Sequence, residues 1–503
     1  MRKTRIICTI GPSSADPAIL EKLMLNGMDI ARINTSHSSM EDALAKINLI
    51  RDIAKRNKID TGILLDLQGP KIRIGKLDDD IFLEDNQDII FTSFLTDNAK
   101  TASDVARKPY PETERKGAGS STSSRLFQKG PVTINVEYKY FLDDIRQGCS
   151  IFIDDGLIEL KVVSIDKKRR LAQAKVIRGG VLKSKKGINL PGITVSVNSV
   201  TEKDLEFLNF GITNNVDFIA QSFVRSSEDI KQIKDIVKKH KSHMMVIAKI
   251  EKHEAIADFE NILRHSDAIM IARGDLGIEI SEEDVPNIQK EIIRKSNITG
   301  KPVITATQML DSMIRNPRPT RAEVSDVANA IFDGSDALML SGETASGAYP
   351  LQALQMMVRI INRTEESLDY TEIMKKKFSQ KQHSITEAIS FAACEIANVL
   401  GATAIITATR SGSTARHISK NRPACMIIGA SSNDYVIRQL MLSWGVIPVR
   451  TKFTKNVSSM LNEAVQVSKN AGYIKDGEKV IITGGILSSR PGSTNFINVR
   501  EID

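Results

Sequence analysis

Eight short runs of apolar, often β-branched residues recur along the first two thirds of the chain. Each run is closed by polar residues or glycine and is followed by a stretch with helical periodicity, so strands and helices are predicted to alternate. Most of the runs are apolar throughout, which is typical of parallel strands covered on both faces. The predicted strands cover residues 5–10, 29–34, 62–67, 217–222, 245–250, 267–272, 302–307 and 337–342.

Eight βα units fit a closed (β/α)8 TIM barrel better than an open sheet. A chain of 503 residues has room for about three domains. After the third predicted strand the helical period is lost, which indicates an inserted β-barrel lid domain. Beyond residue 350, four more apolar runs begin at Ala404, Cys425, Gly445 and Lys479 and predict a doubly wound α/β domain. The expected domains are residues 1–71 with 191–350 (barrel), 72–190 (lid) and 351–503 (C-terminal α/β domain).

Composition narrows the class of protein. The hydrophobic share of 41% excludes a disordered chain. No window approaches eighteen consecutive uncharged apolar residues, so no membrane segment and no membrane partner are predicted, and a cytoplasmic protein is expected. The four cysteines are far apart, which excludes a CxxC zinc ribbon and gives no sign of a disulfide framework.

The net charge of +8 leaves two kinds of partner open, a nucleic acid or a polyanionic small substrate. The basic runs at residues 167–170, 183–186 and 375–377 are scattered, and no aromatic residues interleave them as stacking platforms. Solvated surface charge is therefore the favoured interpretation of these runs, and no nucleic-acid partner is expected.

Charged and polar residues follow several of the predicted barrel strands. Because the active site of such a barrel lies at the carboxyl ends of its strands, these side chains are expected to share one rim. The exits contain Arg32 to His37 after the second strand, Asp66 to Arg73 after the third, Lys249 and Glu251 at the fifth, Arg273 to Gly277 after the sixth, and Thr305 to Gln308 at the seventh.

Two carboxylates from neighbouring exits, Glu251 and Asp275, make the sparse oxygen site that Mg²⁺ uses when phosphates and water complete its shell. Arg32, Arg73 and Lys249 supply cations for phosphate oxygens. A metal site with three cations predicts phosphoryl transfer, in which the protein mainly positions the reactants and neutralises charge.

At this point the chain resembles the pyruvate kinase family. The matching motifs are ARINTSH (31–37), LDLQGPKIR (65–73), SKKGINLPG (184–192), AKIE (248–251), MIARGDLGIEI (270–280) and a long segment at 304–350, in family order. The resemblance implies an enzyme of glycolysis that transfers the phosphoryl group of phosphoenolpyruvate to ADP, giving pyruvate and ATP. It also implies Mg²⁺, with Mn²⁺ as an alternative ion, and a homotetramer.

The resemblance also assigns roles to individual residues. Lys249, Arg32 and Thr307 would be catalytic, and Gly274 and Asp275 would join them in binding phosphoenolpyruvate. Glu251 and Asp275 would bind Mg²⁺. The nucleotide would be bound by Asn34, Thr35, Ser36, His37, Arg73 and Lys186.

One departure from the family pattern concerns monovalent cations. Many members bind K⁺ through residues matching Asn34, Ser36, Asp66 and Leu67, with threonine at the last position and glutamate where this chain has Lys71. Leu67 offers no hydroxyl and Lys71 brings its own positive charge. The hypothesis is that the Lys71 ammonium replaces K⁺ and that K⁺ is not required. The alternative is an exposed lysine paired with a nearby aspartate.

A hydroxyl-rich turn between a strand and a helix contains Thr407, Thr409, Ser411, Gly412, Ser413 and Thr414. Backbone N–H groups and the positive helix end at such a turn suit a phosphate. In the family this position holds the phosphate of an allosteric effector, and residues 488–494 resemble the loop that closes over it. Activation by a phosphorylated metabolite is therefore expected.

Two other functions share some of these features. A barrel lyase or aldolase acting on pyruvate enolates could use the same lysine and carboxylates, but it would need neither a lid nor phosphate-binding arginines. A metabolite-sensing or RNA-binding protein could keep the barrel without turnover, yet no catalytic group is missing from this sequence.

Overall fold

A computed structural model describes residues 2–93, 132–378, 384–452, 457–485 and 494–503. The chain divides into two compact units. The barrel unit comprises Met1–Gly69, Ser199–Leu276 and Glu283–Asp503, and the lid unit comprises Pro70–Asn198 and Gly277–Glu282. The barrel and the C-terminal sheet both belong to the barrel unit.

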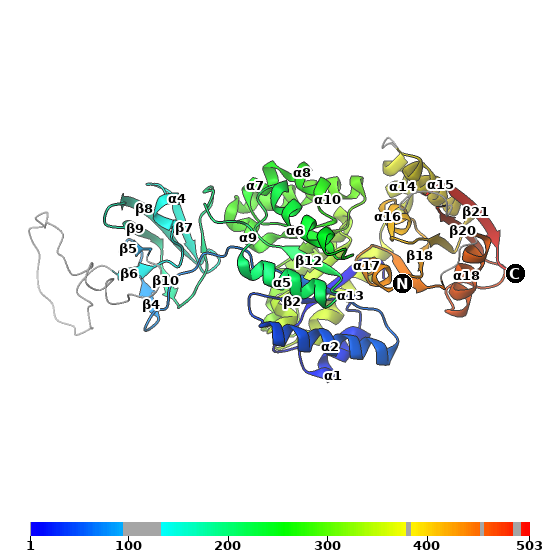
Figure 1. The fold of residues 1–503 in the computed structure, drawn as a ribbon, viewed down its shortest axis with the longest axis horizontal. Helices are drawn as coiled ribbons and strands as arrows, with labels where there is room; N and C mark the ends of the chain where they lie inside the picture. Colours follow the sequence, from blue (N-terminus) through cyan, green and yellow to red (C-terminus); the bar gives the residue numbers. More distant parts are fainter. Residues whose placement is uncertain (1, 94–131, 379–383, 453–456, 486–493) are drawn as a thin grey trace, which may run out of the picture. The chain divides into compact units, whose positions relative to one another are not determined.

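The eight predicted barrel strands form a closed parallel barrel in the order β1-β16-β15-β14-β13-β12-β3-β2, which confirms the TIM fold (Figure 1). Their side chains are buried almost throughout, as the unbroken apolar runs predicted. The strands are β1 (Arg5–Thr9), β2 (Ile30–Asn34), β3 (Gly62–Asp66), β12 (Phe218–Gln221), β13 (Met245–Ile250), β14 (Ala268–Ala272), β15 (Val303–Ala306) and β16 (Ala337–Leu340).

Helices connect these strands, and several begin with a side chain that caps the free N–H groups of the first turn. Asp16 caps the first helix, and Thr201 and Thr320 form capping boxes with Asp204 and Glu323. The helices are α1 (Pro17–Leu25), α2 (Met40–Asn57), α5 (Glu202–Thr213), α6 (Ser227–Lys239), α7 (His253–Ala257), α8 (Phe259–His265), α9 (Arg273–Glu279), α10 (Val285–Thr299), α11 (Arg321–Asp333), α12 (Gly342–Ala345) and α13 (Pro350–Glu366). Two 3₁₀ turns lie at Glu282–Asp284 and Asp311–Ile314.

The lid unit has its own buried apolar core, which includes Phe91, Phe141 and Leu160. Its main sheet has the order β11-β7-β8-β9-β5-β6, and β10 pairs only with β4 in a separate two-stranded sheet. Arg73 and Ile74 bridge to Gly187 beside β11 and to Val136 beside β6, so the segment after β3 links the two edges of this sheet. The inserted β lid domain expected from the sequence is thereby confirmed. The elements are β4 (Ile81–Leu83), β5 (Asp88–Thr92), β6 (Val132–Asn135), α4 (Phe141–Asp144), β7 (Ser150–Ile153), β8 (Ile158–Asp166), β9 (Leu171–Arg178), β10 (Gly180–Leu182) and β11 (Ile188–Asn189).

The C-terminal part forms a five-stranded sheet in the order β19-β18-β17-β20-β21, with an apolar core on each face. This confirms the α/β prediction, and it adds an antiparallel edge strand, β21, to the four parallel strands expected. The elements are α14 (Tyr370–Phe378), α15 (Ile385–Leu400), β17 (Ala404–Ala408), α16 (Ser413–Lys420), β18 (Met426–Ser431), α17 (Asp434–Leu440), β19 (Val446–Arg450), α18 (Val457–Asn470), β20 (Lys479–Gly484) and β21 (Phe496–Glu501).

The C-terminal sheet is anchored to the barrel by buried residues. Leu442, which follows α17, belongs to the apolar core inside the barrel. Arg438 forms an ion pair with Asp217 at 2.7 Å, and Arg422 forms one with Asp336 at 3.0 Å. These contacts reach the barrel next to the amino ends of its strands, opposite the rim where the catalytic side chains are expected.

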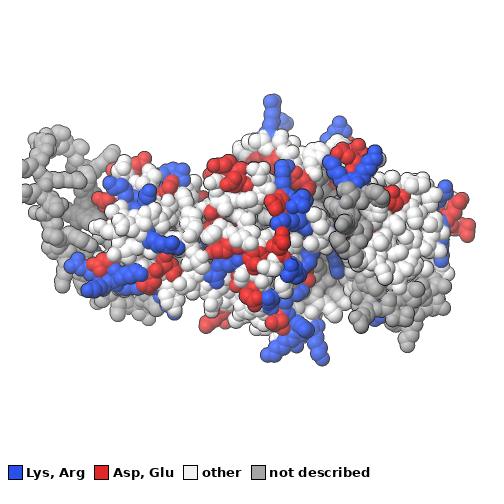
Figure 2. Space-filling model, turned by 90° about the horizontal axis from the view of Figure 1, so that it is seen from above, with Lys and Arg blue, Asp and Glu red and all other residues white. Residues whose placement is uncertain are grey.

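Lys and Arg side chains are intermixed with Asp and Glu on the face shown in Figure 2. The basic residues do not merge into one stripe there. Among the described residues, no helix combines the length and the apolarity needed to cross a membrane.

Candidate active site

Arg32, Asp66 and Lys249 form a buried ion network at the carboxyl ends of β2, β3 and β13. Arg32 Nε donates to Asp66 Oδ2 at 2.7 Å, and Lys249 Nζ lies 3.2 Å from Asp66 Oδ1. Arg32 Nη1 donates to the hydroxyl of Thr9 at 2.8 Å. The Asp66 side chain is 1% exposed, so a single buried carboxylate orients both cations.

The ammonium of Lys249 is surrounded by three oxygen atoms. Besides Asp66, it contacts Glu251 Oε1 at 2.8 Å and donates to Ser222 Oγ at 2.7 Å. Ser222 in turn donates to the backbone oxygen of Leu67 at 2.7 Å. Since an ammonium has three N–H donors, these partners fix its position and direction.

Burial and charge act in opposite directions on this network. Burial by itself lowers the pKa of Lys249, but Asp66 and Glu251 outweigh it and hold that pKa above its ordinary value. Burial also raises the pKa of Asp66, and the charges of Lys249 and Arg32 bring it below its ordinary value. Lys249 is therefore a permanent positive charge at neutral pH, held where water is largely excluded.

Glu251 and Asp275 fit a divalent cation. Burial raises the pKa of Glu251, and repulsion from Asp275 adds to that rise while Lys249 opposes it. A cation between the two carboxylates would remove this repulsion. The described residues contain no group of three or more metal-ligating side chains, so the chain offers two carboxylates, as suits Mg²⁺ that also takes phosphate and water oxygens.

Thr307 lies in a strained turn after β15. Its φ is +67° and that of Gln308 is +55°, a left-handed conformation that is costly for a β-branched residue. The Thr307 hydroxyl accepts a hydrogen bond from the Gly274 N–H at 2.8 Å. Arg273 holds the turn by donating to the backbone oxygen of Thr307 at 3.0 Å, and it is itself paired with Asp326 at 2.7 Å.

The segment proposed for the nucleotide phosphates is a compact turn after β2. Thr35 is buried. Its N–H and its hydroxyl both donate hydrogen bonds to the backbone oxygen of Asp66, at 3.0 and 2.9 Å. The Ser36 N–H donates to Asn34 Oδ1 at 3.0 Å. Ser36 is half-buried and His37 is exposed, whereas the side chain of Thr35 is turned inward.

The remaining residues expected at the cleft belong to the lid unit and have partners there. Lys71 Nζ lies 3.7 Å from Asp155 Oδ1, and Lys186 Nζ lies 2.8 Å from Asp154 Oδ1. Arg73 donates to the backbone oxygen of Lys185 at 3.1 Å. The barrel unit thus brings together Arg32, Asp66, Lys249, Glu251, Asp275, Gly274 and Thr307.

Of the residues expected to hold an effector phosphate, some are already hydrogen-bonded within the protein, and the others lie in the turn before α16 or at the start of that helix. Thr407 is buried and donates to the backbone oxygen of Ile428 at 3.1 Å, and Thr414 pairs with Thr494 at 2.9 Å. The backbone N–H of Thr409 donates to Ala430 at 2.9 Å. Ser411 and Gly412 form the turn itself, with Gly412 at φ +77°, and Ser413 begins α16. Of the expected closing loop, 488–493 lies outside the described residues.

Two positioning residues were missed by the sequence reasoning. Ser222, which contacts Lys249, directly follows β12, and Arg273 directly follows β14. Both are polar residues at strand exits. The signals that could have identified them are a polar residue at the exit of the fourth strand and an arginine at the exit of the sixth, which the sequence analysis included in the rim without giving it a role.

Comparisons with known proteins agree with this architecture. Residues 1–111 and 118–354 match the family model of the pyruvate kinase barrel domain, and residues 387–500 match that of the pyruvate kinase alpha/beta domain. Pyruvate kinases of Staphylococcus aureus strains MRSA252 and USA300 are each 43% identical over 503 residues, which is 100% of this chain and 81% of theirs.

Among solved structures, a pyruvate kinase from Cryptosporidium parvum superposes with a TM-score of 0.87 at 34% sequence identity. That match covers 100% of this chain and 96% of the other. The family models and these relatives all point to pyruvate kinase, and none supports the lyase, aldolase or non-enzymatic interpretation. The chain belongs to the pyruvate kinase family.

Proposed function

We propose that the buried ammonium of Lys249 stabilises the phosphoryl group as it passes from phosphoenolpyruvate to ADP. As a pyruvate kinase, the chain is an enzyme of glycolysis that gives pyruvate and ATP. The observation that carries the proposal is the fixed position of Lys249 Nζ, between Asp66, Glu251 and Ser222. A charge held in place before the reaction stabilises a developing anion without reorganisation.

Arg32 would bind phosphate oxygens beside Lys249. Its Nε and Nη1 atoms are already engaged by Asp66 and Thr9, which orients the rest of the guanidinium. A planar guanidinium fixed in this way suits the oxygens of a phosphoryl group. Arg32 and Lys249 together would balance the charge that the phosphoryl group carries in flight.

Glu251 and Asp275 would hold Mg²⁺, or Mn²⁺ in its place. When bound, the ion would neutralise phosphate charge and help to align the substrate. The support is the repulsion between the buried carboxylate of Glu251 and the half-buried carboxylate of Asp275, which a cation would relieve. Pyruvate kinases generally require Mg²⁺.

Gly274, Asp275 and Thr307 would bind the carboxylate of phosphoenolpyruvate. Loss of the phosphoryl group leaves an enolate, which needs one proton on its terminal carbon to become pyruvate. Thr307 would lie on the route of that proton. The support is the hydroxyl of Thr307, which the strained turn and the Gly274 N–H hold in one orientation.

The nucleotide would extend from the turn after β2 toward the lid. Asn34, Ser36 and His37 would lie along its phosphates, and Arg73 and Lys186 would reach it from the lid unit. Thr35 would contribute through the turn it stabilises, because its hydroxyl is bound to the Asp66 backbone.

K⁺ independence is proposed on the chemistry of two positions. Leu67, buried where many family members have threonine, has no oxygen in its side chain. Lys71 supplies a positive charge in the same motif, and its neighbour Asp155 is 69% exposed, so the ion pair at 3.7 Å is weakly held. An assay in Na⁺- and K⁺-free buffer should give full activity, and activation of about tenfold or more by K⁺ would refute the proposal.

A phosphorylated effector at Ser411, Gly412 and Ser413 is proposed because this turn opens a helix of eight residues. Fructose 1,6-bisphosphate, ribose 5-phosphate, glucose 6-phosphate and AMP should be titrated one at a time. At least one should lower the phosphoenolpyruvate concentration that gives half-maximal rate. If none changes it, the chain has no such activation.

A cytoplasmic homotetramer is proposed for the assembled enzyme. Large apolar side chains are exposed on α15, where Ile385 is 73% and Val399 is 79% exposed. An assembly that covered these side chains would remove their apolar surface from water. Light scattering after gel filtration should give four times the chain mass of 55.5 kDa, and a monomer would contradict the proposal.

The reaction itself is tested by coupling pyruvate formation to lactate dehydrogenase. The purified chain should oxidise NADH only when phosphoenolpyruvate, ADP and Mg²⁺ are all present. A rate that does not depend on ADP would point to a phosphatase or lyase instead.

A further inference from the structure

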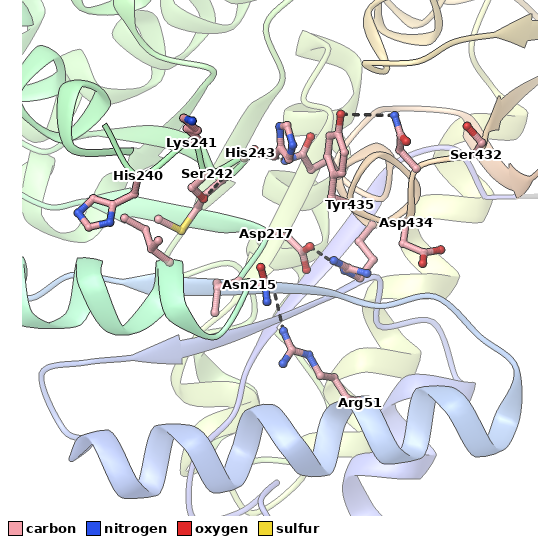
Figure 3. Close-up of a pocket in the computed structure, with 16 residues that line it drawn as sticks. Arg51, Asn215, Asp217, His240, Lys241, Ser242, His243, Ser432, Asp434 and Tyr435 are labelled. Atoms are coloured by element: carbon pink, nitrogen blue, oxygen red, sulfur yellow. Dashed lines mark hydrogen bonds and ion pairs between the residues drawn. The ribbon is translucent and has the colours of Figure 1, made fainter. Parts of the chain in front are cut away.

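A cavity of about 610 Å³ lies between the barrel and the C-terminal sheet (Figure 3). It is lined by α2, by the end of α5, by the segments that lead into β12 and β13, and by α17 with the two residues before it. Because these segments precede their strands, the cavity opens at the amino end of the barrel. It is therefore separate from the site built around Lys249, which lies at the carboxyl ends.

The carboxylates that line the cavity are already in ion pairs, whereas its lysine is in none within the described residues, so positive charge is available to bind a ligand. Its two carboxylates are already paired: Asp217 with Arg438 at 2.7 Å, and Asp434 with Arg450 at 2.8 Å. Lys241 is exposed at the cavity edge, in a left-handed conformation with φ +53°, and its ammonium has no ion-pair partner among the described residues.

Two stacked aromatic rings are among the residues that line the cavity. The imidazole of His243, from the segment before β13, is stacked on the ring of Tyr435 in α17, with centroids 4.0 Å apart and planes 5° from parallel. Tyr435 OH also accepts a hydrogen bond from Asn433 at 3.4 Å. His240 lines the same cavity from the end of α6, so two imidazoles and one ammonium lie around one space.

We propose that this cavity binds a small phosphorylated metabolite, with the phosphate near Lys241 and the two histidines. A phosphate monoester carries between one and two negative charges at neutral pH, which the Lys241 ammonium complements. The ring N–H groups of the two histidines can donate hydrogen bonds to its oxygens. The cavity volume leaves room for the rest of a metabolite of sugar or nucleotide size, beside the stacked rings of His243 and Tyr435. A metal is not favoured, since no third metal-ligating side chain joins His240 and His243 among the described residues.

The walls of the cavity connect to both sites proposed above. Asn433 Nδ2 donates to the backbone oxygen of Arg410 at 2.7 Å, next to the turn at Ser411. Asp217 accepts from the N–H of Ile63 in β3 at 3.0 Å, and β3 ends at Asp66. A ligand that touches both walls would favour one placement of the C-terminal sheet on the barrel, and would thereby affect the active site.

Binding is tested by calorimetry on the full-length enzyme carrying Ser413→Glu, which places a carboxylate in the turn after β17 and so blocks a phosphate there. The probes are inorganic phosphate, glucose 6-phosphate and AMP, with adenosine as the phosphate-free control. At least one phosphorylated probe should bind with a Kd below about 1 mM, and adenosine should bind at least tenfold more weakly than AMP.

Lys241→Glu, added to the same background, should raise that Kd at least tenfold, equivalent to about 1.4 kcal/mol. Lys239→Glu is the matched control: it makes the same charge change at an exposed lysine of α6 outside the cavity, and it should leave the Kd within about twofold. The Lys249 site is untouched, so failure here would leave the proposed reaction standing.

Three results would overturn the proposal. One is the absence of binding by every phosphorylated probe. Another is a Lys241→Glu protein that binds as tightly as its parent. The last is an equal loss in the Lys239→Glu protein, which would show that net charge, and not the cavity, attracts the phosphate.

Discussion

Lys249 and Asp66 meet across β12, with 3.2 Å between the ammonium nitrogen and Oδ1 of the carboxylate. The two residues come from β13 and β3, which are not neighbours in the barrel. Ser222, which directly follows β12, lies between them with its Oγ 3.3 Å from Asp66 Oδ1. One buried carboxylate therefore sets the positions of Lys249 and, through its other oxygen, of Arg32.

Asp66→Asn should lower kcat about 10²-fold, because Lys249 and Arg32 lose the charge that orients them and small displacements at a reacting centre cost this much. Asp52→Asn, at an exposed position of α2, is the control and should leave kcat unchanged. The coupled assay at saturating substrates measures both. An Asp66→Asn protein with wild-type kcat would show that Asp66 does not position the two cations.

The same carboxylate should make stability depend on pH. Its pKa is lowered in the folded protein, so its stabilising effect is fully present above the unfolded pKa of about 3.9 and is lost as the pH falls toward the folded value. The difference in melting temperature between wild type and Asp66→Asn should therefore shrink below about pH 4. Thermal melts from pH 7 to pH 3 measure it, and a difference that stays constant over that range would contradict the predicted linkage.

The hydroxyl of Thr307 can be separated from its backbone conformation. Thr307→Ser keeps the acceptor for the Gly274 N–H and should retain kcat within about threefold, whereas Thr307→Ala should lose about 10² in kcat if the hydroxyl serves proton delivery. Both substitutions keep a Cβ in the left-handed turn. Equal activity of the two proteins would remove Thr307 from the proton route.

The sequence was sufficient to predict the elements whose residues are buried on both sides. Most of the eight barrel strands are nearly continuous apolar runs, and the four parallel strands of the C-terminal sheet are mainly apolar as well. β21 was missed because it is an edge strand: Phe496 to Glu501 contains Arg500 and Glu501, and it is only partly buried. The pairing of β4 with β10 in the lid joins residues about a hundred positions apart, which no local pattern encodes.

The sequence was enough to predict which strand ends carry the residues of the candidate site. It did not predict which side chains would pair with one another there. Strand order brings Lys249, Glu251 and Asp275 to one rim, and the sequence already indicated this. The double ion pair of Asp66 could not be read from sequence, where Asp66 was assigned to a K⁺ position. The left-handed conformation of Thr307 is likewise imposed by packing around Arg273, against the preference of threonine itself.

Glu251→Gln tests the metal site with little change in shape. Removal of one of two carboxylates should raise the Mg²⁺ concentration for half-maximal activity at least about tenfold. Glu228→Gln, at a 74% exposed side chain of α6, is the matched control. Mg²⁺ titrations after treatment with a chelator measure this concentration, and an unchanged value would exclude Glu251 as a ligand.

Lys71→Glu tests the proposed replacement of K⁺. Removing the ammonium and adding a carboxylate should make the enzyme depend on an added monovalent cation, with activation by K⁺ of about tenfold or more. Lys76→Glu makes the same charge change at an exposed lysine of the lid unit and should create no such dependence. A Lys71→Glu protein that remains fully active without K⁺ would show that the Lys71 ammonium does not replace this ion.

The most direct test of the central assignment is the turnover of Lys249→Met in the coupled lactate dehydrogenase assay. Methionine keeps much of the volume of the lysine stem and removes the charge. Lys55→Met, at an exposed position of α2, is the control and should match wild type. If Lys249 stabilises the phosphoryl group in flight, its loss should lower kcat about 10³-fold, as for removal of a strong electrostatic donor. A Lys249→Met enzyme within about tenfold of wild type, under the same conditions, would contradict the assignment.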